Sequence, residues 1–475
     1  MDSRVKLEQA QEEIDNNYSV PQTSNSTQRK KSEKEKIIET SFFENENYIL
    51  EQIDPATDAT LATILQKVRT PKFIKYSKLD KKIEEIEEVR EGGYNIRPIT
   101  NKIVDKKTIL LPSGVEEYET TDKLIKEIKD YFYSYFEVPN LFNYFLPYYV
   151  LFTWIYDKFP FVPYLHFVGL TSTGKSTAAE VVGSVCYKAI DAGGSVTIAA
   201  IFRAADQWRG TLMLDEFDLA NFGEEGYGAL SSFLKTGVAD KTILRVEGDT
   251  KRELTPYSVK SPKIFTSEMP ISGAGLQSRV ILIKMEENKR KIPLFRLPKY
   301  QVKGQSLRNK LLLWRLHNLN KIDLSEIEFG FEELQPFNRR VQQVLTPIYY
   351  LSNDDGKKEI LKFAKVQQEE TVRERRESLE GMVFEVISDL WNLIQIQPTL
   401  GEIFTKVAEK RSKMGYKSIL TERKLANIIR KVLNFDIDRV GHENISTVLI
   451  EKDLDRMATL TKYYGCNKEG SPPPE

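Results

Sequence analysis

YLHFVGLTSTGKST, at residues 164–177, joins an apolar segment to a glycine-bounded loop and then to the expected start of a helix. Gly169, four further residues and then Gly174, Lys175 and Ser176 have the spacing of a phosphate-binding P-loop. Glycine lets the backbone turn without Cβ clashes, so that successive N–H groups point towards phosphate oxygens. A helix that begins near Lys175 adds the positive end of its dipole. The stretch predicts a buried strand, a phosphate-binding loop and a helix; the alternative is a glycine-rich turn without a ligand.

The chemistry of a P-loop assigns roles to its residues. Lys175 is expected to reach the β- and γ-phosphates of ATP, and the Ser176 hydroxyl is expected to hold Mg²⁺. The other positions predicted to contact the nucleotide are Gly169, Thr171, Ser172, Thr173, Gly174 and Thr177.

A second motif, GTLMLDEFD at residues 210–218, is an apolar segment that ends in two acids. This order is typical of a Walker B strand. Asp215 is predicted to bind Mg²⁺ through water, and Glu216 is predicted to be the general base that polarises the attacking water. An apolar segment followed by Asp-Glu also occurs at ordinary strand ends, but its position 40 residues after Lys175 favours an ATPase.

Composition limits the class of protein. The chain has 475 residues, enough for about three domains, and 40% of them are hydrophobic. The formal net charge is zero, so a nucleic-acid site must be local. Two cysteines, Cys186 and Cys466, lie far apart, which favours a reducing compartment. The three histidines, His166, His317 and His442, are scattered and predict no metal cluster.

The sequence predicts neither a signal peptide nor a membrane span. The N-terminus lacks an apolar targeting core, and the most apolar run, Leu141–Tyr156, is too short for a bilayer. We interpret this run as a buried aromatic helix that leads into the P-loop strand. A cytoplasmic protein without a membrane partner is therefore expected.

The region before this helix divides into a tail and a small module. Residues 1–40 are polar and charge-rich, and the run RKKSEKEK at 29–36 indicates either a disordered solvated tail or a contact with a phosphate backbone. Residues 41–120 are predicted to form a small α+β module with a charged helix at Lys78–Arg90. Its predicted strands are Tyr48–Ile53, Phe73–Tyr76 and Thr108–Leu111. From Thr121, one apolar face at helical spacing is made by Leu124, Ile128, Tyr131 and Phe132.

After the Asp-Glu motif, a helix is predicted at Tyr227–Lys235. Thr242–Glu247 and Leu254–Val259 then alternate around a tip that carries Lys251 and Arg252, which predicts a β-hairpin with a basic tip. The next strand, at 262–270, ends in polar Thr266 and Ser267. Arg279 then enters another apolar strand, at 276–284.

Together, the P-loop, the Asp-Glu strand, the hairpin before a polar-ended strand and the arginine at a strand start resemble the AAA+ ATPases. The order is most similar to superfamily III-type helicases and to helicase-like replication ATPases of plasmids, viruses and mobile elements. The resemblance implies an α/β, three-layer ASCE core at 121–290, a helical lid at 291–366, and ATP with Mg²⁺ as ligands.

The resemblance also implies further site residues. Thr266 or Ser267 becomes the sensor that contacts the γ-phosphate or the attacking water, although the family usually has Asn there. Arg279 becomes an arginine finger that acts on the ATP of a neighbouring subunit, the alternative being an ordinary ion-paired arginine. Arg339 and Arg340, which head a predicted helix, become the second sensor of the lid or else plain surface residues.

Residues 381–465 are predicted to form a winged-helix-like domain of three helices and a hairpin, after a charged connector at 367–380. Thr421 is the expected N-cap of the third helix. Its apolar stripe is Leu425, Ile428, Ile429, Val432 and Leu433. Its other face carries the predicted DNA contacts Arg423, Lys424, Asn427, Arg430 and Lys431. A protein contact is the alternative use of this face.

The function expected from the sequence is an ATP-hydrolysing DNA helicase or translocase in the replication of a mobile element. Because an arginine finger acts between subunits, a homo-oligomer is expected, most simply a hexamer. The alternatives are an initiator or loader that assembles on DNA without unwinding it and, less in keeping with the C-terminal region, a small-molecule kinase.

Overall fold

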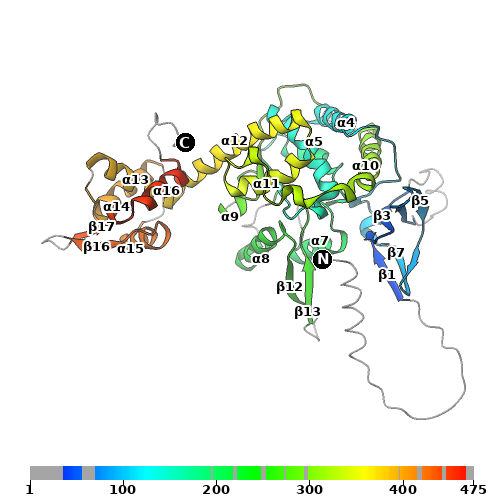
Figure 1. Cartoon of the computed structure of the whole chain (residues 1–475), viewed down its shortest axis with the longest axis horizontal. Coiled ribbons are helices and arrows are strands. Elements are labelled where there is room, and N and C mark those ends of the chain that lie inside the picture. Colours follow the sequence, from blue (N-terminus) through cyan, green and yellow to red (C-terminus); the bar gives the residue numbers. More distant parts are fainter. Residues whose placement is uncertain are drawn as a thin grey trace, which may run out of the picture. The chain divides into compact units, whose positions relative to one another are not determined.

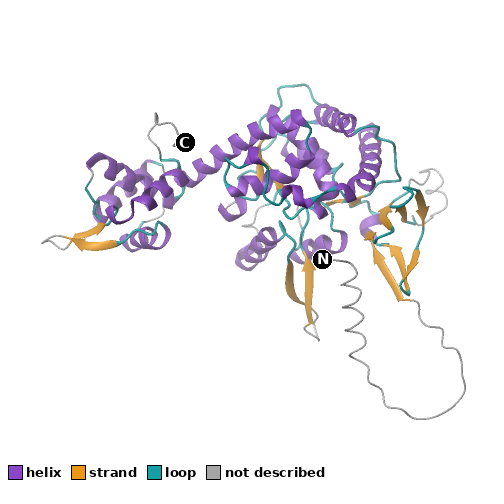
Figure 2. Ribbon diagram, in the orientation of Figure 1, coloured by secondary structure: helices purple, strands orange, loops and turns teal. Residues whose placement is uncertain are grey.

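The computed structural model describes residues 36–55, 70–193, 196–217, 222–247, 253–271, 274–293, 298–394, 396–414, 420–440 and 445–466. Figure 1 shows the chain coloured along its sequence, and Figure 2 shows its helices and strands. Two compact units are present. The larger comprises the chain up to Gln335 together with Gln342–Ile360, and the smaller comprises Pro336–Val341 and the chain from Leu361 onward.

A six-stranded sheet forms the centre of the larger unit, in the order β15-β9-β14-β11-β10-β8. Its strands are β8 (Ile109–Leu110), β9 (Tyr164–Val168), β10 (Ala189–Asp191), β11 (Leu212–Leu214), β14 (Lys263–Ser267) and β15 (Val280–Lys284). The first five strands of this order are parallel, and β8 pairs with β10 in the antiparallel sense. All five residues of β9 are buried, as expected for a central strand of a parallel sheet that is covered on both faces. The predicted α/β class, with a largely parallel sheet, is confirmed.

The register brings the C-terminal ends of four neighbouring strands to one edge of this sheet. Val168, the last residue of β9, lies opposite Ser267 of β14 and Lys284 of β15. Leu214, the last residue of β11, lies opposite Phe265. The loops that follow β9, β11 and β14 therefore start side by side, although they are far apart in the sequence.

Helices pack around the sheet (Figure 2). They are α4 (Thr121–Tyr135), α5 (Asn140–Ile155), α6 (Lys175–Gly183), α7 (Ile198–Trp208), α8 (Gly223–Thr236), α9 (Ala274–Gln277) and α10 (Pro298–Asn318). Two further helices, α11 (Arg339–Leu351) and α12 (Asp354–Glu377), each contribute residues to both compact units. The apolar face predicted for α4 is buried, and so is the aromatic helix α5, which contains Pro147. No helix within the described ranges is long and apolar enough to cross a membrane.

The N-terminal module of the larger unit consists of two small sheets. The antiparallel order β2-β3-β4-β5 is formed by β2 (Phe42–Glu44), β3 (Tyr48–Ile53), β4 (Lys72–Ser77) and β5 (Ile83–Ile86). The order β1-β7-β6 is formed by β1 (Lys36–Thr40), β6 (Val89–Glu91) and β7 (Tyr94–Pro98), and α3 (Lys102–Asp105) follows. Strands predicted at 48–53 and 73–76 are thus confirmed.

Two predictions for this region were wrong. The charged helix expected at Lys78–Arg90 is replaced by β5 and β6, because Ile83 pairs with Tyr76 of β4 in a hairpin whose turn contains left-handed Lys81. This cross-strand pairing outweighs the helix propensity of the Glu and Lys residues. The tail expected to run to residue 40 includes β1, whose five residues pair with β7; residues 1–35 lie outside the described part.

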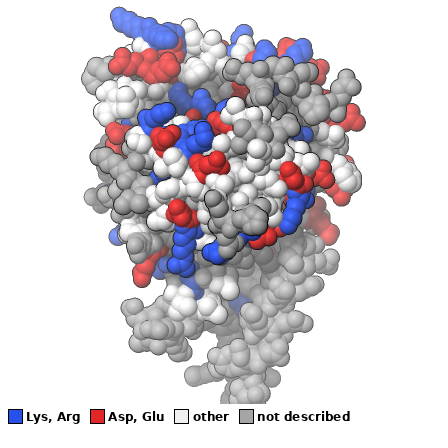
Figure 3. All heavy atoms as spheres, turned by 90° about the vertical axis from the view of Figure 1, so that its left-hand side faces the viewer, with Lys and Arg blue, Asp and Glu red and all other residues white. Residues whose placement is uncertain are grey.

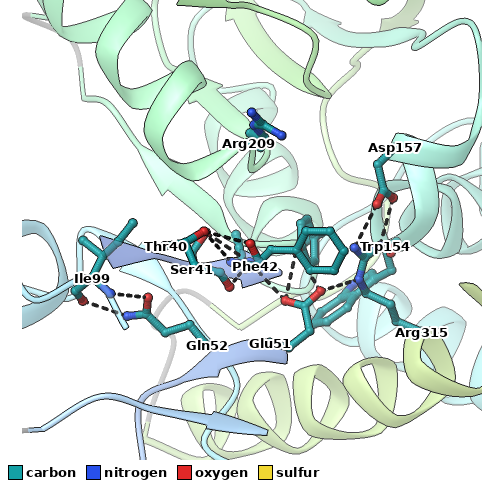
Figure 4. Close-up of polar contacts among 12 residues, drawn as sticks. Thr40, Ser41, Phe42, Glu51, Gln52, Ile99, Trp154, Asp157, Arg209 and Arg315 are labelled. Atoms are coloured by element: carbon teal, nitrogen blue, oxygen red, sulfur yellow. Dashed lines mark hydrogen bonds and ion pairs between the residues drawn. The ribbon is translucent and has the colours of Figure 1, made fainter. Parts of the chain in front are cut away.

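A buried cluster of charges joins the module to the rest of the larger unit (Figure 4). Arg315 of α10 contacts Glu51 of β3 with its Nε, at 2.6 Å, and both oxygens of Asp157 with its two terminal nitrogens, at 2.9 and 3.0 Å. Lys188 lies 3.0 Å from Glu51. The side chains of Glu51, Arg315 and Lys188 are at most 2% exposed. The buried charges of Glu51, Arg315 and Lys188 are therefore paired with one another and with the partly exposed Asp157.

The smaller unit contains α13 (Leu379–Ile394), α14 (Leu400–Lys413), α15 (Glu422–Asn427), the hairpin β16 (Ile437–Val440) and β17 (Ile445–Val448), and α16 (Leu454–Tyr464). Thr421 is the N-cap of α15, as predicted, since its side chain accepts a hydrogen bond from the Lys424 backbone N–H at 3.2 Å. Val432 was wrongly assigned to the buried stripe and is 47% exposed. The cause is a π-helical turn at Ile428–Val432, which shifts the side chains around the helix axis.

Candidate nucleotide-binding site

The predicted P-loop joins β9 to α6, and the backbone requires glycine at both of its ends. Gly174, the residue before α6, has a φ of +81°, a left-handed conformation that residues with a Cβ rarely adopt. At Gly169, a Cβ atom would lie 2.6 Å from Thr173 Oγ1 and 2.8 Å from the carbonyl oxygen of Met285. Gly174 is therefore needed for its left-handed backbone, and Gly169 is needed because a Cβ atom would clash with neighbouring atoms.

The hydroxyl side chains of the loop point in different directions. Thr173 is buried, and its hydroxyl donates to the Leu170 carbonyl oxygen at 2.8 Å. Thr171 is exposed, and its hydroxyl donates to Glu268 Oε1 at 2.9 Å. Ser172 is also exposed and has a φ of +71°. Thr173 thus stabilises the loop itself, whereas Thr171 and Ser172 face outward.

The Asp215–Glu216 turn follows β11 at the same edge of the sheet. The Thr266 hydroxyl donates to Asp215 Oδ1 and accepts a hydrogen bond from the Glu216 backbone N–H at 2.8 Å. The Thr266 carbonyl oxygen accepts another from Phe217 N at 2.8 Å. Glu216 is exposed and has a φ of +50°. A left-handed residue with a Cβ costs about 1–2 kcal/mol, which these hydrogen bonds offset.

Ser267 contacts a residue that the sequence did not single out for the site. Its hydroxyl donates to the Met269 carbonyl oxygen at 2.5 Å and lies 2.6 Å from His166 Nε2. Because the only proton of this hydroxyl is used towards Met269, His166 must donate from Nε2. The other ring nitrogen, Nδ1, is buried and has no hydrogen-bond partner among the described residues. Burial lowers the pKa of His166 to about 4, so the ring is neutral at physiological pH.

A cavity of about 70 Å³ lies between α6 and the ends of β10, β11 and β14. Ser176, Asp215 and Thr266, all singled out by the sequence, line it. Glu180 and Asp191 also line it and were missed, because neither belongs to a local motif. Only the tertiary structure brings β10 beside the Asp-Glu strand.

The oxygen groups of this cavity fit Mg²⁺. Ser176 offers a hydroxyl and Asp215 a carboxylate, which are ligand types that Mg²⁺ prefers. Within the described ranges, no three His, Cys, Asp or Glu side chains are arranged to hold a metal ion by themselves. Mg²⁺ commonly keeps waters and uses one or two carboxylates with substrate phosphates. Ser176 and Asp215 would therefore hold the ion together with a nucleotide.

Arg279 lies at the opposite edge of the sheet from the P-loop. It precedes Val280, which pairs with Tyr164 at the start of β9, whereas the P-loop follows Val168 at the end of β9. One terminal nitrogen of Arg279 donates to the Gly275 carbonyl oxygen, and its Nε is buried without a partner in the part of the chain described. Five strand residues, about 16 Å at 3.3 Å each, thus separate Arg279 from its own P-loop.

The other predicted site residues lie on α11 and on the predicted hairpin. Arg339 and Arg340 begin α11 and belong to the smaller unit, so their role as a second sensor stays a prediction. The predicted hairpin is present as β12 (Thr242–Glu247) and β13 (Glu253–Ser258), with Thr242 opposite Ser258. Its basic tip, with Lys251 and Arg252, lies outside the described residues.

In the smaller unit, the candidate DNA contacts lie on one exposed helix face. They are Arg423, Lys424, Asn427, Arg430 and Lys431, all of which are exposed. Arg430 also donates to the Ile437 carbonyl oxygen of β16 at 3.3 Å, so it fastens the helix to the hairpin. On the face of the molecule drawn in Figure 3, acidic and basic side chains are interspersed. No broad patch of one charge is therefore seen among the described residues on that side.

Comparison with known proteins finds no matching family model and no matching curated protein. Among solved structures, the chain is similar to the apo A form of the NrS-1 C-terminal region, with 11% identity and a TM-score of 0.38, over 80% of this chain and 93% of that one. It is also similar to the SCCmec type IV Cch active helicase, with 14% identity and a TM-score of 0.42, over 88% and 80% of the two chains. These likenesses are too distant to bear on function.

Proposed function

We propose that this chain is an ATP-hydrolysing DNA helicase or translocase of the AAA+ type, acting in the replication of a mobile element. One observation carries the ATPase part of the proposal. The P-loop and the Asp215–Glu216 turn meet at one edge of a parallel sheet, beside a cavity lined by Ser176 and Asp215. Strand β14, inserted between the P-loop strand and the Asp-Glu strand, supports an ASCE core.

Each site residue at this edge of the sheet then has a proposed role in ATP hydrolysis. Lys175 and the N-terminus of α6 stabilise negative charge on the β- and γ-phosphates. Glu216 takes the proton from the attacking water as the water oxygen bonds to the γ-phosphorus and the bond to the ADP oxygen breaks. Ser176 and, through water, Asp215 would hold Mg²⁺, which would neutralise charge on the phosphates. Arg339 and Arg340 are proposed to contact the nucleotide from the lid.

The position of Arg279 supports the proposal of a homo-oligomer, most simply a hexameric ring. Because it lies at the far edge of the sheet, Arg279 is suited to the ATP of a neighbouring subunit and not to its own. Mixing Arg279→Ala subunits with Lys175→Ala subunits should restore hydrolysis that each variant lacks alone. If the mixture stays inactive while unmixed wild type is active, Arg279 does not act between subunits.

DNA is the proposed partner of the motor. The exposed basic face of α15, in a proposed winged-helix domain, supports the initial binding of DNA. The hairpin tip with Lys251 and Arg252 is proposed to bind the DNA backbone during translocation. Such interactions with phosphates are independent of base sequence and sensitive to salt.

The test of this function combines ATP hydrolysis with strand displacement. We expect single-stranded or duplex DNA to accelerate hydrolysis and a partly duplex substrate to be unwound in an ATP-dependent manner. ATP-dependent assembly on DNA without unwinding would replace the motor by the initiator or loader. Turnover that requires a small-molecule acceptor would replace both by a kinase.

A further inference from the structure

Thr266 is bound to the Asp-Glu turn through both its side chain and its backbone. Its side chain is 1% exposed, its hydroxyl bridges Asp215 Oδ1 and the Glu216 backbone N–H, and its carbonyl oxygen binds Phe217 N. Three consecutive residues of the turn are thus bound to one residue of β14. The middle one, Glu216, is the residue with the left-handed backbone.

The number of hydrogen bonds that the Thr266 hydroxyl can donate and accept limits its possible role. A threonine hydroxyl has one proton and two lone pairs. The proton goes to Asp215, because an ionised carboxylate can only accept, and one lone pair receives the Glu216 N–H. The proton of the Ser267 hydroxyl is likewise used, towards the Met269 carbonyl oxygen. In this arrangement neither hydroxyl has a proton left to donate to a γ-phosphate.

We infer that Thr266 is a positioning residue: its hydroxyl holds the carboxylate of Asp215, which lines the cavity, and fixes the backbone that presents Glu216. This role rests on the proposed ATPase function and differs from a direct interaction with the nucleotide. A residue of this kind affects the rate of the chemical step, because the general base must lie within hydrogen-bond reach of the water. Nucleotide affinity, set by the P-loop, is left intact.

The structure supplies a matched set of variants. Thr266→Val keeps the shape of the side chain and deletes the hydroxyl, and Thr266→Ser keeps the hydroxyl and deletes a methyl group. Thr211→Val is the control, because Thr211 is fully buried just before β11 and its hydroxyl has no hydrogen-bond partner among the described residues. The same chemical change is therefore made in the same sheet without removing a hydrogen bond.

The experiment measures kcat for ATP hydrolysis, the dissociation constant of a fluorescent ATP analogue and thermal unfolding for each full-length variant. We expect Thr266→Val to reduce kcat about 100-fold, the scale of a small misplacement of catalytic groups, with unchanged nucleotide affinity. Thr266→Ser should recover most of the rate, and Thr211→Val should match wild type throughout.

Each other outcome is decisive. Wild-type kcat in Thr266→Val would overturn the inference and leave the ATPase proposal standing. A large decrease of nucleotide affinity in a folded Thr266→Val would make Thr266 a nucleotide-binding residue instead. Failure of Thr266→Ser to recover the rate, although it melts like wild type, would assign the effect to packing. A wild-type chain that neither binds nor hydrolyses ATP would overturn the ATPase proposal and this inference with it.

Discussion

His166 is a buried histidine close to the P-loop in the sequence. The hydrogen-bond partners of its ring fit the neutral form and not the doubly protonated form. Its Nε2 donates to Ser267, and its Nδ1 has no acceptor within the described structure, so a second proton would have no partner. This agrees with the pKa of about 4 that burial imposes, against an ordinary value of 6.5. Below pH 6.5 the unfolded chain binds a proton at this ring that the folded chain does not bind until the pH nears 4.

The stability contributed by neutral His166 is therefore complete above pH 6.5 and is lost as the pH falls towards 4. The difference in pKa corresponds to about 3 kcal/mol of unfolding free energy at most. Urea unfolding of wild type and His166→Gln, at several pH values between 4 and 7, isolates this contribution because the carboxylates are common to both proteins. The two curves should converge towards low pH. Parallel curves would show that folding does not lower the pKa of His166.

For single residues, the sequence predicts those site residues that belong to short motifs with a characteristic spacing. The P-loop glycines and the Asp215–Glu216 pair belong to short motifs, and the structure places them together. His166, Glu180 and Asp191 could not be predicted, because their positions depend on which strands become neighbours. Thr266 was singled out for its place at a strand end, but its bridge to two residues about 50 positions earlier depends on the register of β14 and β11.

Among the elements, α15 carries a testable surface. Arg423 and Lys424 are exposed and take part in no packing that the fold needs. The double variant Arg423→Ala with Lys424→Ala should bind duplex DNA more weakly. The slope of log affinity against log salt should fall by about one for each phosphate interaction that the substitutions remove. Lys452→Ala with Lys462→Ala removes the same charge from exposed positions outside α15 and is the control. Equal effects of the two pairs would leave only general electrostatic attraction.

Some helices and strands could be predicted from local sequence patterns, and others could not. The apolar face of α4 and the Thr421 N-cap follow from periodicity and from capping chemistry, and both are observed. The segment 78–90 has helix-forming residues, yet pairing with β4 makes it β-structure, a non-local effect. Val432 is exposed because a single π-helical turn breaks the 3.6-residue period on which its prediction depended.

At the scale of the whole molecule, the buried charge cluster makes the N-terminal module part of the larger unit. Arg315 and Glu51 are 264 residues apart in the sequence and in contact in the fold. No local pattern could pair them, so the sequence suggested a separate small module at 41–120. The structure places that module and the central sheet in one compact unit.

Removal of one charge from this cluster should destabilise the whole unit. Glu51→Gln leaves Lys188 and part of Arg315 buried without their carboxylate, at a cost of about 3–5 kcal/mol of unfolding free energy. Glu88→Gln in the same module is the control, because the Glu88–Arg97 pair is partly exposed and exposed ion pairs contribute little to stability. Urea unfolding measures both. A double variant with Lys188→Met should cost less than the sum of its single changes. Equal stability of Glu51→Gln and Glu88→Gln would contradict this account of the cluster.

The central claim is that the edge formed by the P-loop and the Asp215–Glu216 turn binds and hydrolyses ATP. The most direct measurement is steady-state hydrolysis together with ATP binding, for wild type, Glu216→Gln and Lys175→Ala. Wild type should hydrolyse ATP. Glu216→Gln should bind ATP as wild type does but turn over about 100-fold or more slowly, because an amide cannot take the proton from water. Lys175→Ala should lose binding. Hydrolysis by Glu216→Gln at the wild-type rate would contradict the claim.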